Sequence, residues 1–445
     1  MEPSEPLAAA ADATASVSGA DTAWLIVACA LVLLMTPALA FFYGGLVRSK
    51  NALNTMMMSF SALGTVIVGW TVVGYSLAFA PGNAWIGGFD FAFLRGVGLE
   101  PRGSVPHLLF MAFQGTFAII TAALISGAVA ERMRFGAYLL FINLWMLAVY
   151  APVCHWVWGG GWLADLGALD FAGGAVVHVN AGIAALVAAL VLGPRRDYGH
   201  QALLPHNVPF VLLGAGLLWF GWFGFNAGSA LAADEVAALA FANTLLAPAA
   251  ALVAWMLLDA LTTRKMTAVG AATGIVVGLV AITPAAGFVG PMSALLIGAI
   301  AAVPSYFAIM KRSRTRLDDS LEVAAAHGLG GMTGAVLTGV FAAAAWGGAE
   351  GALTGNLRQL GVQLFSVAAV LAYSGAASLL LLKGIRWIVP LRVTAREEGT
   401  GLDIPLHGEE AYAHGDGAVL LLPPTARPEK RAAPLGSEAG LEASA

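Results

Sequence analysis

The sequence predicts an all-α membrane protein that crosses the bilayer many times, and three observations lead to this fold class. Only 11% of the 445 residues are charged and 59% are hydrophobic, whereas soluble domains carry about 25% charged residues. Eleven apolar runs approach or exceed the ~20 residues that one crossing needs. Basic residues collect in every second connection between these runs, as in proteins whose alternate loops face the cytoplasm.

The apolar runs follow one another with short connections. We expect spans at residues 22–47, 52–80, 106–130, 135–153, 171–193, 207–228, 237–261, 266–284, 290–310, 322–345 and 361–388. Residues 1–21 contain no Lys or Arg, so they lack the basic start of a secretory signal and are expected to be a short disordered tail outside the membrane. Residues 389–415 form a polar tail, and residues 416–445 are expected to be disordered.

The basic residues predict the orientation. Those that follow odd-numbered spans are Arg48, Lys50, Arg132, Arg134, Arg195, Arg196, Arg264, Lys265, Lys311, Arg312, Arg314 and Arg316. The other connections hold only Arg95, Arg102 and Arg358. Since cytoplasmic loops are enriched in Lys and Arg, the N-terminus should lie outside and the C-terminus in the cytoplasm. The small net charge of -4 argues against a nucleic-acid partner.

Two histidines lie inside apolar runs, His178 in FAGGAVVHVNAG and His327 in LEVAAAHGLGGMTG. Each lies roughly 10 Å into its span, where an ionisable side chain usually marks a functional site. Because the two spans run in opposite directions, the imidazoles should approach each other near the midplane. They could pass a small hydrogen-bonding solute, relay a proton or ligate haem, or they could be satisfied core groups.

The chain also shows signs of internal duplication. Spans five and ten each carry one such histidine followed by small residues, and spans one and six both end in aromatic–glycine clusters. Each repeat would contain five spans, and because five is an odd number, the two repeats would have opposite orientations in the membrane. We therefore expect an inverted 5+5 pseudo-repeat plus a final helix, a plan in which the substrate path lies at the interface of the halves.

Aromatic and polar residues gather near the outer ends of several spans. They are Phe113 and Phe117 in span three, Trp158 in the outer loop before span five, Asp170 at the start of span five, and Trp222, Phe225 and Ser229 in span six. Aromatic faces attract small cations by ~0.5–1 kcal/mol, or ~2 kcal/mol when desolvated. These residues could therefore recognise a small cation, although such aromatics can also be interfacial anchors and Asp170 a helix N-cap.

The free energy of moving an ion into an apolar medium limits which solutes could pass. A bare ion in a low-dielectric medium costs on the order of tens of kcal/mol, which cation–π contacts cannot offset. A cation that can lose its proton, such as ammonium, meets this demand, whereas potassium does not. The sequence contains no GxxxxGK[ST], HExxH or CxxC motif, so we expect neither an enzyme nor a metal or cofactor. Glu131, Asp259 and Glu322 are expected to be structural.

Long segments between about residues 22 and 415 resemble the ammonium transporter (Amt) family of bacterial inner membranes. They are FFYGGLVRSKN, FQGTF, ALISGAVAERMRF, WGGGWLADLGALDFAGGAVVHVNAG, GWFGFNAGSA, ALAFANT, ITPAAGFVG, AHGLGGMTGAVLTG and GLDIPLHGEEAY. The resemblance implies eleven transmembrane helices and a homotrimer in the cell inner membrane, in contact with lipid. It also implies a channel-transporter that recruits ammonium, or methylammonium as an analogue, removes a proton and conducts ammonia.

The resemblance implies roles for individual residues. The residues expected to recognise the substrate are Phe117, Trp158, Ser229 and Asp170. The gate is expected to be Phe113 stacked on Phe225. The residues expected to line the pore are His178, His327, Trp222 and Thr283. In the tail, Gly401, Leu402, Asp403, His407 and Gly408 match the segment that meets PII-type nitrogen signal proteins. Glu322 stands where relatives carry Asp. An ammonium sensor signalling through this tail remains an alternative, as does a channel for carbon dioxide or another neutral gas.

Overall fold

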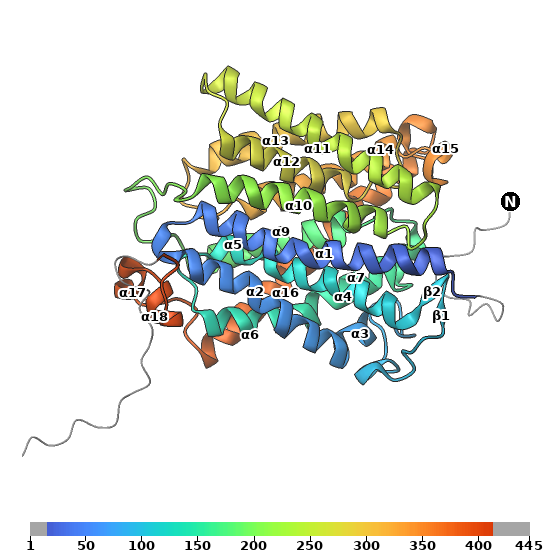
Figure 1. Ribbon diagram of the computed structural model, residues 1–445, viewed down its shortest axis with the longest axis horizontal. Coiled ribbons are helices and arrows are strands. Elements are labelled where there is room, and N and C mark those ends of the chain that lie inside the picture. Colours follow the sequence, from blue (N-terminus) through green and yellow to red (C-terminus); the bar gives the residue numbers. More distant parts are fainter. Residues whose placement is uncertain (1–15, 413–445) are drawn as a thin grey trace, which may run out of the picture.

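The computed structural model describes residues 16–412, and its first half is a series of apolar helices with one small hairpin (Figure 1). Its elements are α1 (Gly19–Leu46), η1 (Ser49–Asn51), α2 (Ala52–Gly69), η2 (Trp70–Gly74), α3 (Tyr75–Phe79), η3 (Ala92–Leu94), β1 (Pro101–Arg102), β2 (Val105–Pro106), α4 (His107–Leu124), α5 (Ser126–Val129), α6 (Phe135–Trp145), η4 (Met146–Tyr150), α7 (Ala151–Trp158), α8 (Trp162–Leu166), η5 (Gly174–Val179) and α9 (Asn180–Leu192). The antiparallel strands pair Pro101 with Pro106 and Arg102 with Val105.

The second half continues the bundle and ends in two short helices. Its elements are α10 (Val208–Gly228), α11 (Glu235–Thr262), α12 (Ala268–Ile282), α13 (Pro291–Arg312), η6 (Ala324–Leu329), α14 (Gly330–Phe341), α15 (Ala344–Gly347), η7 (Ala352–Thr354), α16 (Leu357–Ile388), α17 (Ala395–Thr400) and α18 (Asp403–His407). Residues 1–15 of the N-terminal tail and residues 416–445, both predicted to be disordered, lie outside the described residues.

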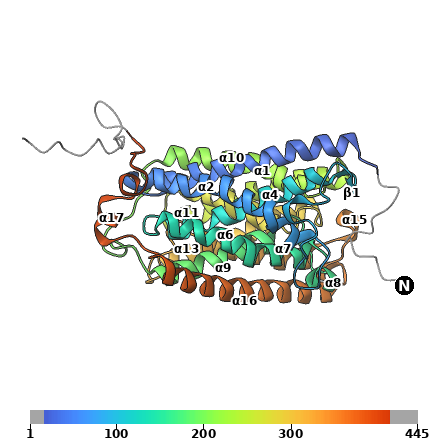
Figure 2. The same ribbon diagram turned by 90° about the horizontal axis from the view of Figure 1, so that it is seen from below.

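The long helices lie side by side, so that the bundle has two distinct ends (Figure 1). The tail end, at the left of the view, carries α17 and α18, and the hairpin end, at the right, carries β1, β2 and α15. Figure 2 shows α16 along one side of the bundle, where it packs on α9 and α14. The last long helix, α16, therefore contacts both helices that follow the histidines.

The described residues contain nine helices that are long and apolar enough to cross a membrane. The other two predicted spans correspond to α12, a shorter apolar helix, and to η6 with α14, which are helical but not among the nine. A multi-pass membrane protein is therefore confirmed, while eleven crossings and the orientation of the termini stay predictions.

Two predicted boundaries are wrong. The N-terminal helix begins at Gly19, before the end of the expected tail at residue 21, because Ser18 caps it by accepting a hydrogen bond from the backbone N–H of Asp21 at 3.3 Å. The fourth span continues beyond residue 153, so Trp158 ends α7 instead of lying in a loop. The helix stops there because the next residues, Gly159, Gly160 and Gly161, disfavour continued helix.

Both histidine spans begin with a π-helical turn of six residues, η5 and η6, and then continue as α-helices. Such turns are rare and frequently lie at functional sites, and η2 and η4 are π-helical turns of five residues. The similarity predicted between these two spans is thus confirmed locally, whereas the full inverted repeat stays a prediction.

Candidate functional site

The structure brings His178 and His327 into direct contact. Their Nδ1 atoms lie 3.3 Å apart, and the rings face each other with centroids 5.4 Å apart. Both side chains are buried. One proton fits between the two nitrogens, so that one imidazole donates the hydrogen bond and the other accepts it.

Glycines allow the two histidine helices to come this close. A Cβ atom on Gly182 would lie 2.3 Å from the Cα atom of Gly328, and one on Gly331 would lie 2.9 Å from the Cβ atom of His178. Small residues at such crossings let backbones approach. A larger side chain at either position would separate the rings.

An aromatic wall orients the first imidazole. Trp222 stacks on His178 with ring centroids 5.4 Å apart and an angle of 20° between the planes. The indole Nε1 of Trp222 donates to Thr283 Oγ1 at 2.9 Å. Within the described part of the chain, the buried Nε2 atom of His178 has no hydrogen-bond partner. This nitrogen is therefore available to a small solute with hydrogen-bonding groups.

The ring contacts correct the expected gate. Phe225 stacks on Phe117, with centroids 4.2 Å apart and 22° between planes, and not on Phe113 as expected. Phe113 lies one turn earlier on α4 and meets Phe117 edge-on at 5.0 Å. A Cβ atom on Gly228 would lie 3.0 Å from the Phe113 ring, so Phe113 is level with the last residues of α10, one turn beyond Phe225. Residues four apart share a helix face but differ in height by one turn.

Trp158 and Asp170 are joined on the hairpin side of these rings. The indole Nε1 of Trp158 donates to the backbone oxygen of Asp170 at 2.8 Å, and the ring meets Phe117 edge-on at 6.0 Å. The Asp170 carboxylate accepts hydrogen bonds from the backbone N–H groups of Gly173, Gly174, Ala175 and Val176 at 2.5–3.0 Å. Asp170 therefore caps the helix as expected, because it satisfies donors that lack partners within the first turn.

Ser229 follows α10 and uses its hydrogen within its own helix end. Its Oγ donates to the backbone oxygen of Phe225 at 2.8 Å. A hydroxyl that donates its only hydrogen keeps lone pairs that can accept. The Ser229 oxygen can therefore accept a hydrogen bond from the N–H group of a cation.

Asp319 is a site residue that the sequence analysis missed. Its Oδ2 atom accepts from the backbone N–H of Ala324 at 2.7 Å, and its buried Oδ1 atom has no partner among residues 16–412. Asp319 precedes His327 by the same eight positions as Asp170 precedes His178, in DSLEVAAAH and DFAGGAVVH. This repeated spacing was visible in the sequence.

His327 opens on a cavity of about 700 Å³ at the tail end. Glu322 and Tyr198 also line it. Glu322 accepts from Arg312 Nε at 2.7 Å, and Arg312 Nη1 contacts the Tyr198 hydroxyl at 3.1 Å. The structural role expected for Glu322 is confirmed.

A network of buried charges adjoins this cavity through Arg195. Glu131 accepts from Arg48 at 2.9 Å and from Arg195 at 3.0 Å, and Arg195 also pairs with Asp318 at 2.8 Å. Burial alone would raise the pKa of the Glu131 carboxyl, but Arg195 and Arg48 hold it below its ordinary value. Glu131 therefore joins three of the loops that carry the basic residues.

Asp259 has a comparable structural role between helices. Its Oδ2 accepts from the backbone N–H of Thr267 at 3.1 Å and from the hydroxyl of the same residue at 2.8 Å. It thus ties the end of α11 to the start of α12.

The tail residues dock on the start of α2. Asp403 accepts from the backbone N–H groups of Asn54 at 2.8 Å and Leu53 at 3.1 Å, and His407 Nε2 contacts Asn54 Oδ1 at 3.0 Å. Burial raises the pKa of Asp403, although the two N–H groups oppose this shift. Burial also lowers the pKa of His407.

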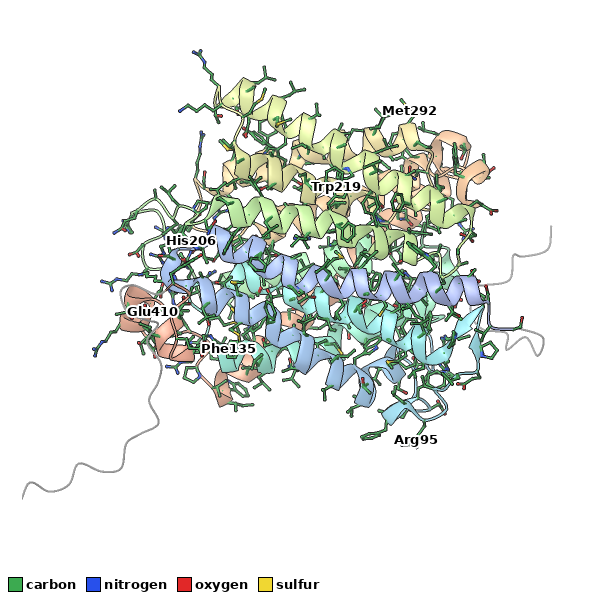
Figure 3. The ribbon with its side chains drawn as sticks, in the orientation of Figure 1. Arg95, Phe135, His206, Trp219, Met292 and Glu410 are labelled. Atoms are coloured by element: carbon green, nitrogen blue, oxygen red, sulfur yellow. The ribbon has the colours of Figure 1, made fainter. Side chains whose placement is uncertain are left out.

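The backbone on either side of this contact turns at glycines. Gly401 and Gly408 have φ values of 107° and 71°, which favour glycine. Leu402 donates its N–H to the backbone oxygen of Lys50 at 3.1 Å. Figure 3 shows Phe135, His206 and Glu410 at this end, and the Phe135 ring meets the His407 imidazole at 4.8 Å. The tail therefore reaches several loops of the bundle.

Comparisons with known proteins agree with this geometry. A model of the Ammonium Transporter Family matches residues 23–412. An ammonium transporter of Bacillus subtilis is 48% identical over 398 residues, which cover 88% of this chain and 98% of that protein. The crystal structure of Saccharomyces cerevisiae Mep2 superposes with a TM-score of 0.80 at 38% identity, covering 85% of this chain and 88% of that one. A solved structure named Sensor Amt Protein has a TM-score of 0.82 at 32% identity, covering 87% and 98%.

Proposed function

Because the chain belongs to the ammonium transporter family, we propose that it takes a proton from ammonium and conducts ammonia past His178 and His327. The observation that carries this proposal is the contact between the two imidazoles, with Nδ1 atoms 3.3 Å apart in a buried path. A neutral pair offers one donor and one acceptor to a solute that has both, as ammonia does.

The apolar surroundings of the pair favour a neutral solute. Phe225 and Trp222 are buried beside the imidazole of His178. Moving a bare cation through such surroundings costs on the order of tens of kcal/mol. The proton therefore leaves ammonium before the histidines, and it either stays outside or crosses by a separate route.

Recruitment takes place on the hairpin side of the stacked rings. There, Trp158 and Phe113 offer aromatic faces, the Ser229 oxygen accepts a hydrogen bond, and Asp170 supplies negative charge. The stack of Phe117 on Phe225 closes the path beyond them. In this assignment, Phe117 is both the floor of the recruitment site and half of the gate, and Phe113 belongs to the mouth.

Asp319 gives the opposite end of the path a carboxylate of its own. Its partnerless Oδ1 atom and its spacing to His327 support a role where ammonium forms again. The tail-end cavity then holds the released ion.

The tail end faces the cytoplasm of the cell inner membrane in this proposal. The paired arginines Arg48, Arg195 and Arg312 all lie around the tail-end cavity or its border network, which supports this orientation by the positive-inside rule. The protein works as a homotrimer surrounded by lipid, with one path in each subunit. The docked tail, residues 401–408, offers a contact surface for a PII-type signal protein.

A second function, ammonium sensing, is favoured by one comparison. The chain is similar over 87% of its length to the Sensor Amt Protein. The docked tail could report the state of the path to a partner. Deleting residues 389–412 separates the two functions, since a sensor loses signalling while flux remains.

The test of transport is methylammonium uptake by cells that lack their own ammonium transporters. We expect saturable uptake that ammonium inhibits. A current in proteoliposomes under an ammonium gradient, measured beside it, tells whether the proton crosses as well. Absence of uptake with well-inserted protein would overturn the proposal.

A further inference from the structure

Gln363 on α16 holds both backbone polar groups of one loop residue with its side-chain amide, whose Oε1 also accepts from Gln359 Nε2 at 3.3 Å. Its Oε1 accepts from the backbone N–H of Leu169 at 2.8 Å, and its Nε2 donates to the backbone oxygen of the same residue at 2.7 Å. The Nε2 atom also donates to the backbone oxygen of Ala335 at 3.1 Å. The side chain is only 2% exposed, so these bonds do not compete with water.

The loop residue held in this way adjoins the recruitment site. Leu169 precedes Asp170, whose carboxylate caps the His178 helix and whose backbone oxygen accepts from the Trp158 indole at 2.8 Å. The bonds to both polar groups of Leu169 restrict the peptide planes on either side of it. The directions of the Asp170 carboxylate and the Trp158 ring therefore depend on Gln363.

The third bond of Gln363 reaches the other half of the site. Ala335 lies on α14, the helix that continues from His327. The amide therefore joins the loop before one histidine to the helix after the other. Gln363 itself lies on α16, the helix that follows the ten spans of the predicted repeat.

Two neighbours support this arrangement. A Cβ atom on Gly339 would lie 2.8 Å from the Cγ atom of Gln363 and 3.0 Å from the Cα atom of Leu360, so glycine lets α14 and α16 approach. Gln359, one turn earlier, donates to the backbone oxygen of Gly167 at 2.9 Å. The last helix thus holds the loop 167–169 at two points.

We propose that Gln363 is a positioning residue for cation recruitment, acting through Leu169 on Asp170 and Trp158. This inference rests on the proposed function. A bond that only stabilised the fold would change the amount of inserted protein. A positioning bond changes the methylammonium concentration that gives half-maximal uptake.

The test compares the parent protein with Gln363→Met, which keeps the length of the side chain but removes its donors and its acceptor. We expect the half-saturating methylammonium concentration to rise about tenfold, as for the loss of one or two hydrogen bonds. The maximal rate per inserted protein should stay within about twofold of the parent, because the path itself is unchanged.

The matched control is Ser378→Ala. Ser378 is a buried residue of the same helix, and its Oγ accepts from the Trp145 indole at 3.0 Å, away from the loop. This variant should keep the half-saturating concentration of the parent while losing comparable stability. Gln359→Met should raise that concentration by about threefold, since it removes the weaker support of the same loop.

The outcomes separate the two proposals. If the parent takes up methylammonium and Gln363→Met has the same half-saturating concentration, Gln363 does not position the site. If Gln363→Met does not insert into the membrane, the half-saturating methylammonium concentration of Gln359→Met tests the inference instead. A value equal to that of the parent protein overturns it. If the well-inserted parent shows no uptake, the proposed function fails, and this inference fails with it.

Discussion

The Nδ1 atoms of His178 and His327 lie 3.3 Å apart, although 149 positions separate the two residues in the chain. Each imidazole is therefore the hydrogen-bond partner of the other. Glycines at the helix crossing, Gly182 and Gly328, allow this contact. The behaviour of each histidine consequently depends on the other.

Replacing one histidine should remove the function of the pair. We expect His178→Ala and His327→Ala each to lower methylammonium uptake roughly tenfold or more, since the solute loses an oriented partner. The double variant should be no more than about twofold slower than the slower single variant, because both changes break the same bond. Initial uptake rates per inserted protein measure this, and multiplicative losses would indicate two independent roles.

Phe113 and Phe117 of α4 should differ in their effects. Phe113→Ala removes a face at the mouth, so the half-saturating methylammonium concentration should rise about 2- to 30-fold, the equivalent of ~0.5–2 kcal/mol. Phe117→Ala opens the stack on Phe225 and should change the maximal rate as well. Uptake curves for both variants check this. A changed maximal rate in Phe113→Ala alone would show that Phe117 is not half of the gate.

The glycine crossing should be sensitive to one methyl group. Gly182→Ala places a Cβ atom 2.3 Å from the Cα atom of Gly328, and such overpacking costs about 1–3 kcal/mol. Thermal unfolding in detergent should therefore begin at a lower temperature. Gly216→Ala is the control, because nothing lies within 4 Å of its added Cβ atom. Equal unfolding temperatures for both variants would contradict the close crossing.

The contribution of His407 to docking of the tail should be lost in acid. Burial lowers the pKa of His407, so a released tail takes up a proton at a pH where the docked tail does not. The stabilisation that His407 gives to docking is therefore complete above the pKa of a free imidazole, about 6.5, and is lost as the pH falls below it, whereas the raised pKa of Asp403 acts in the opposite direction. Hydrogen-exchange protection factors of residues 401–408, in which the intrinsic rate at each pH is divided by the measured rate, report the change between pH 8 and 5.5.

His407→Gln provides the control for this pH effect. An amide can still donate to Asn54 Oδ1, which His407 Nε2 contacts at 3.0 Å, but it does not titrate. Protection factors in this variant should no longer fall between pH 6.5 and 5.5. The same fall as in the parent would exclude His407 as the responsible group.

The meeting of the two histidines could be predicted because both determinants are local. Depth follows from the position of His178 and His327 within their apolar runs, and direction follows from the basic loops. The cap formed by Asp170 was also readable, since Asp before a helix commonly accepts backbone N–H groups. Asp319 was overlooked, although its spacing to His327 repeats that of Asp170 to His178.

The ring contacts could not be predicted in the same way. Phe113 and Phe117 lie on the same face of α4, so the sequence does not tell which of them is level with Phe225. The fourth span was also predicted to end too early, at residue 153, whereas its helix continues to Trp158. The aromatic residues before Trp158 are compatible with an apolar helix and with an interfacial loop, so composition does not distinguish the two. The role of Gln363 needs a contact between α16 and a loop 194 positions earlier.

By itself, the sequence determined a multi-pass membrane protein and placed two histidines at similar depths in two of its spans. These properties follow from the length, hydropathy and charge of continuous segments, which the bilayer selects along the chain. Membership of the ammonium transporter family follows instead from long matching motifs. Only the tertiary structure decided that Phe117 stacks on Phe225 and that Gln363 holds the loop before Asp170. Such contacts depend on how far each helix is shifted and rotated against its neighbours, and close packing between distant segments sets both.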